Sequence, residues 1–438
     1  MEYEIILGLE IHMQLNTQSK MFCGCKNDPF FSEPNENVCP VCLGLPGAMP
    51  VPNKDALLKA QRFVRAVGSK LNTNIIYERK NYFYPDLPKG FQLTCPHNPV
   101  GIGGEIDLSY YLDKNSSQKD GVVRFREIHL EEDTAKSMHK DGKTFIDFNK
   151  SGVPLLEIVT EPDFRDIEFA VKYCKELQLI ARFTNVSEAD MEKGNMRLEA
   201  NISVRKVGET ELPDYRVELK NINSFTFMKK ALQYEVDRQI KALRKGETLY
   251  QETRGFNPET GETFVQRTKE DAHDYRYFPE PDIPPIFVDE EWLNKVMSEE
   301  LILPSDIRRD LQEVGLNKDY INSLMKDKER YMVYKELVEM GYKPSKAANL
   351  VVNEAGYKDK SANEIDSAEK EKESSKISSE SELEKIIEQI VSENEKAVND
   401  YKSGNENSLQ FLIGQVMKAT KGKADVSVAR KILLTHLK

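Results

Sequence analysis

Apolar and polar residues alternate along several short stretches in the first half of the chain. In residues 9–15, the polar side chains of Glu10, His12 and Gln14 alternate with apolar ones. Because successive side chains of a strand point to opposite faces, this alternation predicts a strand with one apolar and one polar face. The pattern recurs at residues 197–205 and 216–220, and carboxylates also occur in the strand-like segments 131–133 and 155–159.

These polar strand faces have two interpretations. They are either the solvated side of an antiparallel sheet or the wall of a pocket that binds Mg²⁺ and phosphate groups. For any single strand, the solvated side is the better interpretation. The repetition of the pattern, together with Glu157 inside an apolar run, favours the pocket.

Apolar residues at helical spacing predict helices between these strands, at residues 54–67, 167–183 and 229–246. The proline-rich stretch 278–285 can continue neither a helix nor a central strand, so we expect a stiff domain edge there. Residues 1–290 are therefore predicted to form one α+β domain.

The remainder of the chain is predicted to be helical. Residues 291–357 predict a helical domain, and residues 358–382, rich in Lys, Glu and Ser, predict a disordered or loose low-complexity linker. Residues 383–438 predict a small tail domain with amphipathic helices at 383–391, 409–417 and 426–436.

Composition and charge argue against several classes of protein. The chain has 438 residues and a formal net charge of −11, which argues weakly against binding of nucleic acid over the whole surface. No apolar run is long enough to span a membrane, and the acidic start is not typical of a signal peptide, so we expect a cytoplasmic protein.

The end of the tail is basic, in contrast to the chain as a whole. Its cations either contact an RNA backbone or form a solvated helix face, and the two interpretations are equally open. The candidate RNA-binding residues are Lys418, Lys421, Lys423, Arg430 and Lys431.

Four cysteines form two close pairs, Cys23 with Cys25 and Cys39 with Cys42. In a cytosolic protein, such spacing favours tetrahedral Zn²⁺ over disulfides. Four thiolate ligands would leave no open position, so the predicted role is structural. The alternative is a set of buried or free thiols.

Residues 79–92 interleave aromatic and basic residues with prolines and predict a rigid surface loop. Such a loop can stack on a base or hold a phosphate, although composition alone favours a packing role. The chain has no Gly-x-x-x-x-Gly-Lys-Ser/Thr loop and no convincing nucleophile set, which argues against a P-loop nucleotidase and against covalent catalysis.

Several strings of residues together resemble the GatB family, the B subunits of tRNA-dependent amidotransferases. They are GLEIH (8–12), residues 79–92, HLEEDTAKS (129–137), PLLEIVTEPD (154–163), ELKNINSF (218–225) and residues 274–282. The resemblance covers residues 1–355 and the tail from Leu383.

The resemblance implies an antiparallel-sheet catalytic cradle distantly like glutamine synthetase, followed by a helical region and a tRNA-binding tail. It implies one component of an enzyme, a carbon–nitrogen ligase with glutamine as amido donor. This component would use ATP to phosphorylate the side-chain carboxylate of Asp-tRNA(Asn), Glu-tRNA(Gln) or both. A partner amidase, the A subunit, would supply ammonia through a channel, and the small C subunit would complete a heterotrimer.

The same resemblance implies a set of site residues. It places Mg²⁺ on His12, Glu132 and Glu157, with Glu10 beside them and Glu199 where relatives often carry Asp. Cations for ATP or acyl-phosphate contact would be Lys80, Lys89 and Arg197. The zinc cysteines also occur in many relatives.

One departure concerns the stretch 358–382, which is short and low in complexity where relatives carry a longer helical region. This departure leaves the orientation of the tail on tRNA open. Three alternatives remain: a Glu-tRNA(Gln)-specific subunit that pairs with an asparaginase-like partner, a non-catalytic zinc and RNA-binding scaffold, and a ligase for a free small carboxylate.

Overall fold

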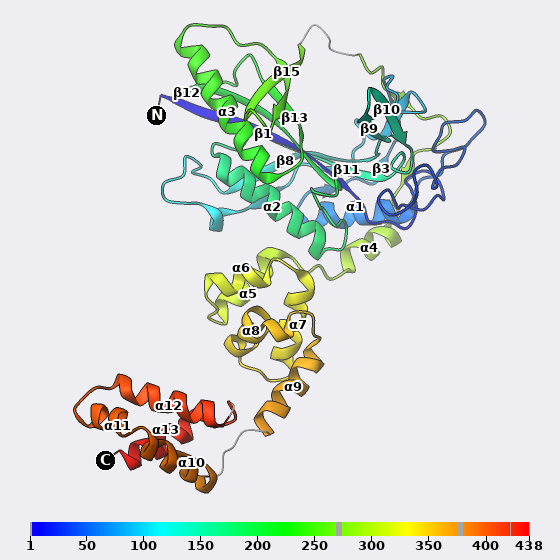
Figure 1. The fold of residues 1–438 in the computed structure, drawn as a ribbon. Coiled ribbons are helices and arrows are strands. Elements are labelled where there is room, and N and C mark those ends of the chain that lie inside the picture. The colour runs from blue at the N-terminus through cyan, green and yellow to red at the C-terminus, as the bar shows by residue number, and fades with distance from the viewer. Residues whose placement is uncertain (1, 269–273, 375–379, 421, 438) are drawn as a thin grey trace. The chain divides into compact units, whose positions relative to one another are not determined.

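The computed structural model describes residues 2–268, 274–374, 380–420 and 422–437. The chain divides into two compact units, Met1–Asp310 and Leu311–Lys438, called here the N-terminal and C-terminal units. The N-terminal unit combines a large sheet with helices and the C-terminal unit is helical, so the chain is of mixed α+β class, as expected (Figure 1).

A ten-stranded sheet forms the centre of the N-terminal unit, in the order β15-β14-β13-β12-β1-β11-β8-β6-β2, with β7 paired to β8. All of its pairs are antiparallel except β13 with β14. The strands are β1 (Tyr3–Gln14), β2 (Lys70–Leu71), β6 (Gly101–Ile102), β7 (Glu105–Asp107), β8 (Val122–Glu132), β11 (Pro154–Thr160), β12 (Met196–Lys206), β13 (Val217–Ile222), β14 (Glu252–Asn257) and β15 (Glu262–Thr268).

The strands predicted from alternation are neighbours at the centre of this sheet. In the register of β1, His12 lies opposite Glu157 on β11 and opposite Arg197 on β12, and Glu10 lies opposite Glu199. Side chains of directly opposed residues share a face, so the register gathers the polar residues on one side of the sheet.

Three helices cover the apolar face of the sheet: α1 (Lys54–Ala66), α2 (Ile167–Phe183) and α3 (Phe225–Arg244). The predictions at 54–67 and 167–183 are confirmed. Helix α3 begins earlier than predicted because the hydroxyl of Ser224 caps it, accepting a hydrogen bond of 3.1 Å from Phe227 N. The core between helices and sheet includes fully buried Leu9, Ile11 and Met13 of β1.

Smaller elements surround this sheet. The proline-rich stretch 278–285 is paired into the unit, since β16 lies against β4 and the buried carboxylate of Glu280 accepts hydrogen bonds from Arg79. The remaining elements of the unit are β3 (Asn74–Ile75), β4 (Glu78–Asn81), β5 (Phe91–Thr94), η1 (Ser109–Tyr111), β9 (Lys136–Lys140), β10 (Lys143–Asp147), β16 (Phe278–Pro279), β17 (Ile286–Phe287) and α4 (Glu290–Ser298).

The rest of the described chain is helical, as predicted, and α10, α12 and α13 contain the three amphipathic stretches expected in the tail. Leu383, Leu412 and Leu433 are fully buried where these three helices pack together. The elements are α5 (Pro304–Glu313), α6 (Lys318–Leu324), α7 (Lys328–Glu339), α8 (Pro344–Asn353), η3 (Ala355–Tyr357), α9 (Ala362–Ser374), α10 (Glu380–Glu393), α11 (Glu395–Lys402), α12 (Asn407–Ala419) and α13 (Val426–His436).

The structure differs from the prediction within residues 358–382. Helix α9 occupies Ala362–Ser374, where we expected no regular structure. Its first turn buries Ala362 and Ile365, and it packs against α7, so two apolar side chains anchor a sequence that is otherwise charged. Throughout the described ranges, every helix is too short or too polar to cross a membrane.

Candidate functional site

The polar face of the sheet carries a cluster of one imidazole and three carboxylates. Nε2 of His12 lies 3.6 Å from Oε1 of Glu10, 3.9 Å from Oε1 of Glu131 and 3.8 Å from Oε1 of Glu157. The residues come from three adjacent strands, β1, β8 and β11. This set is called the His12 cluster below. One donor atom each from Glu10, His12 and Glu157 lie within 4.8 Å of one another, which is close enough to hold a metal ion.

Local sequence accounts for this gathering. Glu10 and His12 are two residues apart on β1, so they share a face while Leu9 and Ile11 point into the core. The pairing of His12 with Glu157 then brings in β11, and the pairing of Glu157 with His129 places the odd-numbered residues at the end of β8 on the same face. Glu131 belongs to that odd-numbered set.

The carboxyl groups of the His12 cluster have raised pKa values. Burial, together with the neighbouring Glu157 and Glu199, raises the pKa of Glu10 to about 9. Burial and like charge also raise the pKa of Glu131 and of Glu157 to about 7 each. Burial, with the charge of Arg197, lowers the pKa of His12, so its imidazole is neutral and offers a lone pair.

Lysine and arginine side chains surround the cluster. Burial alone would lower the pKa of Lys80, but the charges of Glu131 and Glu157 outweigh this effect and raise it. Lys220 Nζ lies 3.0 Å from Oε2 of Glu199 and 3.2 Å from Oε1 of Glu218. These cations leave a site with both signs of charge, suited to a ligand that carries phosphate groups and a metal ion.

Arg197 lies on the same face and is held in place by a buried carboxylate. Its Nη2 lies 3.0 Å from Oδ1 of Asp133, and the other oxygen of Asp133 pairs with Lys150 Nζ at 2.6 Å. Gln14 Nε2 donates to the same carboxylate at 2.8 Å. Asp133 therefore orients Arg197 and closes the polar face at one end.

Two predicted site residues lie elsewhere. Glu132, which we expected to bind metal, forms a buried ion pair with Lys89, which we expected to bind phosphate. Oε1 of Glu132 also accepts a hydrogen bond of 3.0 Å from Leu93 N. This placement follows from strand alternation, because Glu131 and not Glu132 shares a face with His129 and His12. That signal was present in the sequence, and it would have identified Glu131.

Glu199, which stands where relatives often carry Asp, lies opposite Glu10. Together with Glu10 and Glu218 it forms a second acidic group whose oxygens lie within 4.8 Å of one another. Glu218 and Lys220 were not among the predicted site residues. The alternation in residues 216–220 indicated them, since they follow β12 on the next strand.

The four paired cysteines come together as predicted. Sγ atoms of Cys23, Cys25, Cys39 and Cys42 lie within 4.8 Å of one another, so the group could hold a structural metal ion. The pKa of Cys42 is lowered to about 5, by a hydrogen bond from Cys23 and despite burial, with help from Cys39 N at 3.1 Å. A thiolate is the form that binds a metal.

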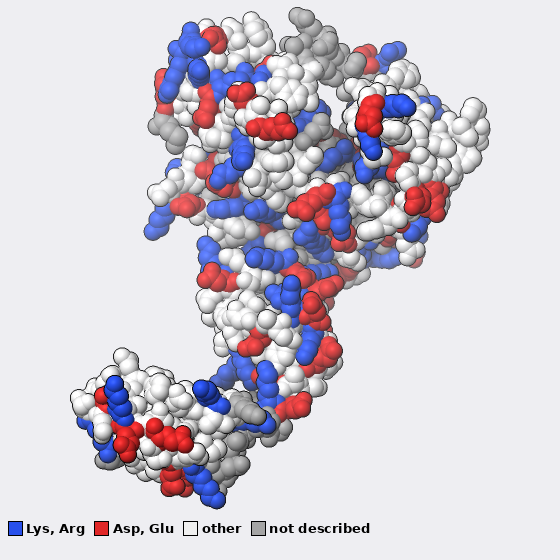
Figure 2. Space-filling view, viewed as in Figure 1, with Lys and Arg blue, Asp and Glu red and all other residues white. Residues whose placement is uncertain are grey.

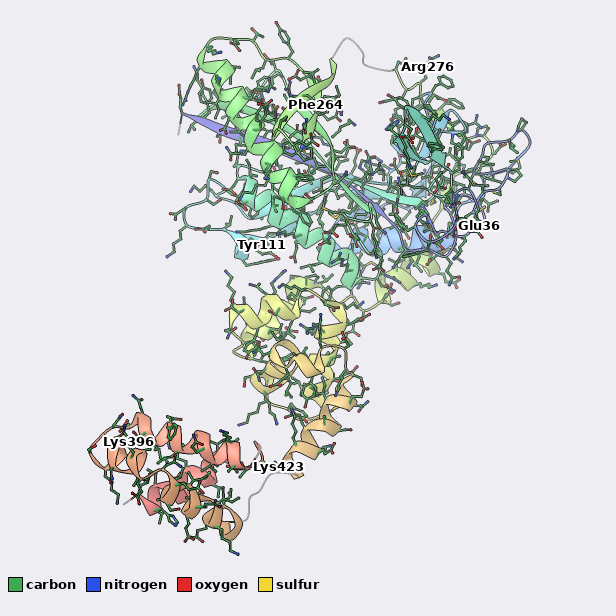
Figure 3. All side chains as sticks on the ribbon, in the orientation of Figure 1. Glu36, Tyr111, Phe264, Arg276, Lys396 and Lys423 are labelled. Carbon is green, nitrogen blue, oxygen red and sulfur yellow. The ribbon has the colours of Figure 1, made fainter. Side chains whose placement is uncertain are left out.

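The basic residues of the tail are exposed where the structure describes them. Lys418 lies in the last turn of α12, Lys423 follows this helix, and Arg430 and Lys431 lie on α13. Lys421 lies outside the described residues. Lys423 is labelled in Figure 3. Figure 2 shows positive and negative side chains interspersed on the visible face of the tail.

Both units of the chain match known protein families. Residues 5–294 match the GatB/GatE catalytic domain, and residues 312–437 match the GatB domain. The chain is 38% identical to the B subunit of the aspartyl/glutamyl-tRNA(Asn/Gln) amidotransferase of Persephonella marina, with all of each chain covered. It is also 38% identical to the B subunit of the same name from Thermodesulfovibrio yellowstonii and 39% identical to that of a Thermoanaerobacter species, again over the full length of each chain.

The chain is also shorter than the Persephonella relative. The alignment with the Persephonella protein extends over 482 positions, more than the 438 residues of this chain. The relative therefore carries residues that have no counterpart here. Their location within the stretch 358–382 stays a prediction.

Proposed function

Because this chain belongs to the GatB/GatE family, we propose that it is the B subunit of a tRNA-dependent amidotransferase and that it activates the amino acid attached to tRNA. In this proposal, the side-chain carboxylate of Asp-tRNA(Asn), Glu-tRNA(Gln) or both attacks the γ-phosphate of ATP. An acyl phosphate and ADP result. Ammonia then displaces the phosphate and forms the amide of Asn-tRNA(Asn) or Gln-tRNA(Gln).

The proposal assigns the release of ammonia to a partner. An amidase, the A subunit, would hydrolyse glutamine and deliver the ammonia through a channel, and the small C subunit would complete a cytoplasmic heterotrimer. The relatives are named as B subunits, which supports an assembly of several different chains. The likeness of the cradle to glutamine synthetase belongs to the same proposal.

The donor set of the His12 cluster fits Mg²⁺. Its ligands would be Glu10, His12 and Glu157, whose donor atoms lie within 4.8 Å of one another, with Glu131 beside His12. Carboxylate oxygens are the ligands that this hard ion prefers. The raised pKa values of Glu10, Glu131 and Glu157 mean that the negative charge of these carboxylates is unfavourable in the cluster, which supports a cation among them. When bound, Mg²⁺ would offset the negative charge that develops in phosphoryl transfer.

Lysine and arginine side chains of the chain would position the phosphate groups of the substrate. Lys80 and Arg197 are directed toward the polar face and would hold phosphate oxygens of ATP or of the acyl phosphate, and Lys220 is a further candidate beside Glu199. Orientation of the carboxylate against the phosphate would supply most of the rate, since no covalent enzyme intermediate is needed.

Two further sites complete the proposal. Zn²⁺ on the four cysteines would brace the loop between β1 and α1, a structural role because four thiolates leave no open position. The tail of residues 383–438 would contact the tRNA backbone through Lys418, Lys421, Lys423, Arg430 and Lys431. The division into domains at 290, 357 and 382 remains part of this proposal.

The single observation that carries the proposed chemistry is the arrangement of the His12 cluster, one neutral imidazole among three carboxylates with Lys80 and Arg197 nearby. The experiment is ATP-dependent amidation by the complex, supplied with ammonium in place of glutamine. The substrates are Asp-tRNA(Asn) and Glu-tRNA(Gln), with free Asp and Glu as controls. Amide on tRNA with matching ADP release is the expected result, and it also identifies the substrate.

Other outcomes favour the alternatives. Amidation of free Asp or Glu would indicate a ligase for small carboxylates. Bound tRNA without any product would favour a zinc and RNA-binding scaffold and would contradict the proposed role of the His12 cluster. Activity on Glu-tRNA(Gln) only, with an asparaginase-like partner, would point to the Glu-specific branch of the GatB/GatE family.

A further inference from the structure

An aromatic hollow lies next to the His12 cluster, between two segments that are far apart in sequence. One wall contains Tyr82, Phe83 and Tyr84, and the other contains Tyr275, Arg276 and Phe278. The cavity volume is about 730 Å³. Arg276, labelled in Figure 3, lies at the periphery of the N-terminal unit, so the hollow is open to the outside. The proposed chemistry makes no use of it.

Hydrogen bonds from Asn81 to backbone carbonyl groups hold the two walls together. Asn81 N donates to the carbonyl of Tyr275 at 3.0 Å, and Asn81 Nδ2 donates to the carbonyl of Arg276 at 2.8 Å. Arg276 has φ of 44°, in the left-handed region that costs a residue with a side chain about 1 kcal/mol. Asp274 supports this conformation by accepting a hydrogen bond of 3.1 Å from Arg276 N. The hollow is therefore formed before any ligand binds.

The rings of the hollow are not used by the core of the protein. Phe83 is 86% exposed, Tyr84 is 65% exposed and Phe278 is 43% exposed. One side of the Phe83 ring rests on Gly90, where a Cβ atom would come within 2.9 Å of the ring. The ring is thus supported on one side and free on the other. Exposed aromatic rings that gather at one place mark a binding surface.

Lys80 connects the hollow with the His12 cluster. It precedes Asn81 on β4, and its Nζ lies 5.0 Å from the centroid of the Tyr275 ring. The charges of Glu131 and Glu157 act on the same ammonium group. A ligand that stacks in the hollow would therefore place its charged end beside Lys80, at the edge of the cluster.

Flat aromatic walls next to lysine and arginine suit an unpaired nucleotide, because every base can stack on a ring and its phosphate pairs with a cation. We propose that the aromatic hollow binds the unpaired 3′-terminal nucleotides of the tRNA substrate by stacking. This inference rests on the proposed function, since it takes aminoacyl-tRNA as the substrate. The inference assigns a binding site for the 3′ end of the tRNA, from which the side-chain carboxylate of the attached amino acid would reach the His12 cluster.

Two observations favour the RNA end over the adenine of ATP as the occupant. The hollow is wide and open, so the 3′ end of a tRNA can enter it while the rest of the tRNA stays outside. In addition, a separate, smaller cavity of about 290 Å³ lies over Gly8 and Asn201. That cavity is on the same face of the sheet, beyond Glu10, and leaves room for a second substrate.

The test measures binding of tRNA to the complete amidotransferase complex at fixed salt, without ATP. Full-length tRNA with 2-aminopurine at its 3′ end is compared with tRNA that lacks its unpaired 3′ nucleotides. The wild type should bind the full-length tRNA more tightly by roughly 5- to 150-fold, the range for stacking of one base, and should quench the probe. Phe83→Leu should abolish most of this difference, and Phe83→Trp should restore it.

Phe31→Leu is the matched control, because Phe31 is 84% exposed and lies outside the hollow. It should behave as the wild type. Equal preference for full-length tRNA in the wild type and in Phe83→Leu would overturn the inference. A raised KM for ATP in Phe83→Leu, with tRNA binding unchanged, would also overturn it and would assign the hollow to the nucleotide. Binding is measured without turnover. A failure of the amidation assay, which tests the proposed function, can therefore be distinguished from a failure of this binding test.

Discussion

At the scale of single residues, the His12 cluster brings three carboxyl groups close to one imidazole ring. Glu10, Glu131 and Glu157 lie within 4 Å of one imidazole nitrogen, and burial raises the pKa of each carboxyl. Nδ1 of His12 is buried without a hydrogen-bond partner in the described part of the chain. Such an arrangement is costly for a protein to maintain without a ligand, and we expect a strong effect from any change in it.

The neighbouring carboxylates Glu131 and Glu132 provide the sharpest test at this scale. Glu131→Gln, like His12→Ala and Glu157→Gln, should lower ATP-dependent acyl phosphorylation by about 100-fold or more while tRNA binding survives, since it removes charge at the reacting groups. Release of ADP on aminoacyl-tRNA measures this loss.

Glu132→Gln serves as the matched control for Glu131→Gln. It should retain most of the activity, but it should lower the free energy of unfolding by about 1–3 kcal/mol, because Lys89 loses its buried partner. Urea unfolding measures this change. Loss of activity in Glu132→Gln with unchanged activity in Glu131→Gln would reverse our assignment.

The cysteine cluster leads to a second prediction for single residues. Cys42→Ser should lose bound zinc and lower the melting temperature, because the most acidic thiol of the group is removed. Metal analysis of the purified chain and thermal unfolding measure both effects. Cys174→Ser changes a buried cysteine on α2 outside the cluster and should leave the zinc content at the wild-type level.

At the scale of elements, α3 is tied to the edge of the sheet by one buried carboxylate. Glu235 of α3 accepts hydrogen bonds from Arg238, and its Oε1 lies 3.0 Å from Arg254 Nε on β14. It also accepts a hydrogen bond from the hydroxyl of Thr263 on β15. Although burial alone would raise the pKa of Glu235, the hydrogen bonds from Arg238 and Thr263 lower it below its ordinary value of 4.5.

This lowered pKa predicts how stability depends on pH. A carboxyl whose pKa is lower in the folded state stabilises the protein above its unfolded pKa and loses this contribution as the pH falls through the folded pKa. Glu235→Gln should thus cost about 1–3 kcal/mol at pH 7, and the difference from the wild type should shrink below pH 4.5. Urea unfolding at both pH values measures it, and an equal difference at both would contradict this explanation.

At the scale of the whole molecule, the proposed chemistry and the proposed RNA contact of the tail belong to different units of the chain. The charged and aromatic groups of the proposed chemistry lie in the N-terminal unit, whereas the exposed cations proposed for RNA lie at the end of the C-terminal unit. The tail has its own buried core, formed by residues such as Leu383, Leu412 and Leu433. Surface substitutions in the tail should therefore change binding without unfolding it.

The prediction for the tail concerns salt. Replacing Lys418, Lys423, Arg430 and Lys431 by Gln should weaken tRNA binding and lower the slope of log Kd against log salt concentration, by about one for each phosphate that is no longer neutralised. Titrations of tRNA at several salt concentrations measure this slope. Deletion of residues 383–438 should have the same effect or a larger one. An unchanged slope would show that these cations face solvent only.

The sequence by itself determined the elements and much of the polar face. Alternation along 9–15 and 197–205 predicted strands with one ionisable side, and cysteine spacing predicted the cluster at Cys23 and Cys42. These signals are local, because the period of a strand and the spacing of close ligands are visible within a few residues. Helix α9 was missed because its charged composition hid the two apolar residues that anchor it.

Only the tertiary structure decided which of these residues meet. The register between β1, β8 and β11 selects Glu131 for the His12 cluster and leaves Glu132 with Lys89. The pairing of β4 with β16 brings Tyr275 beside Tyr82, although almost two hundred residues separate them. Such contacts depend on long-range strand pairing, and no periodicity within a short window of sequence specifies that pairing.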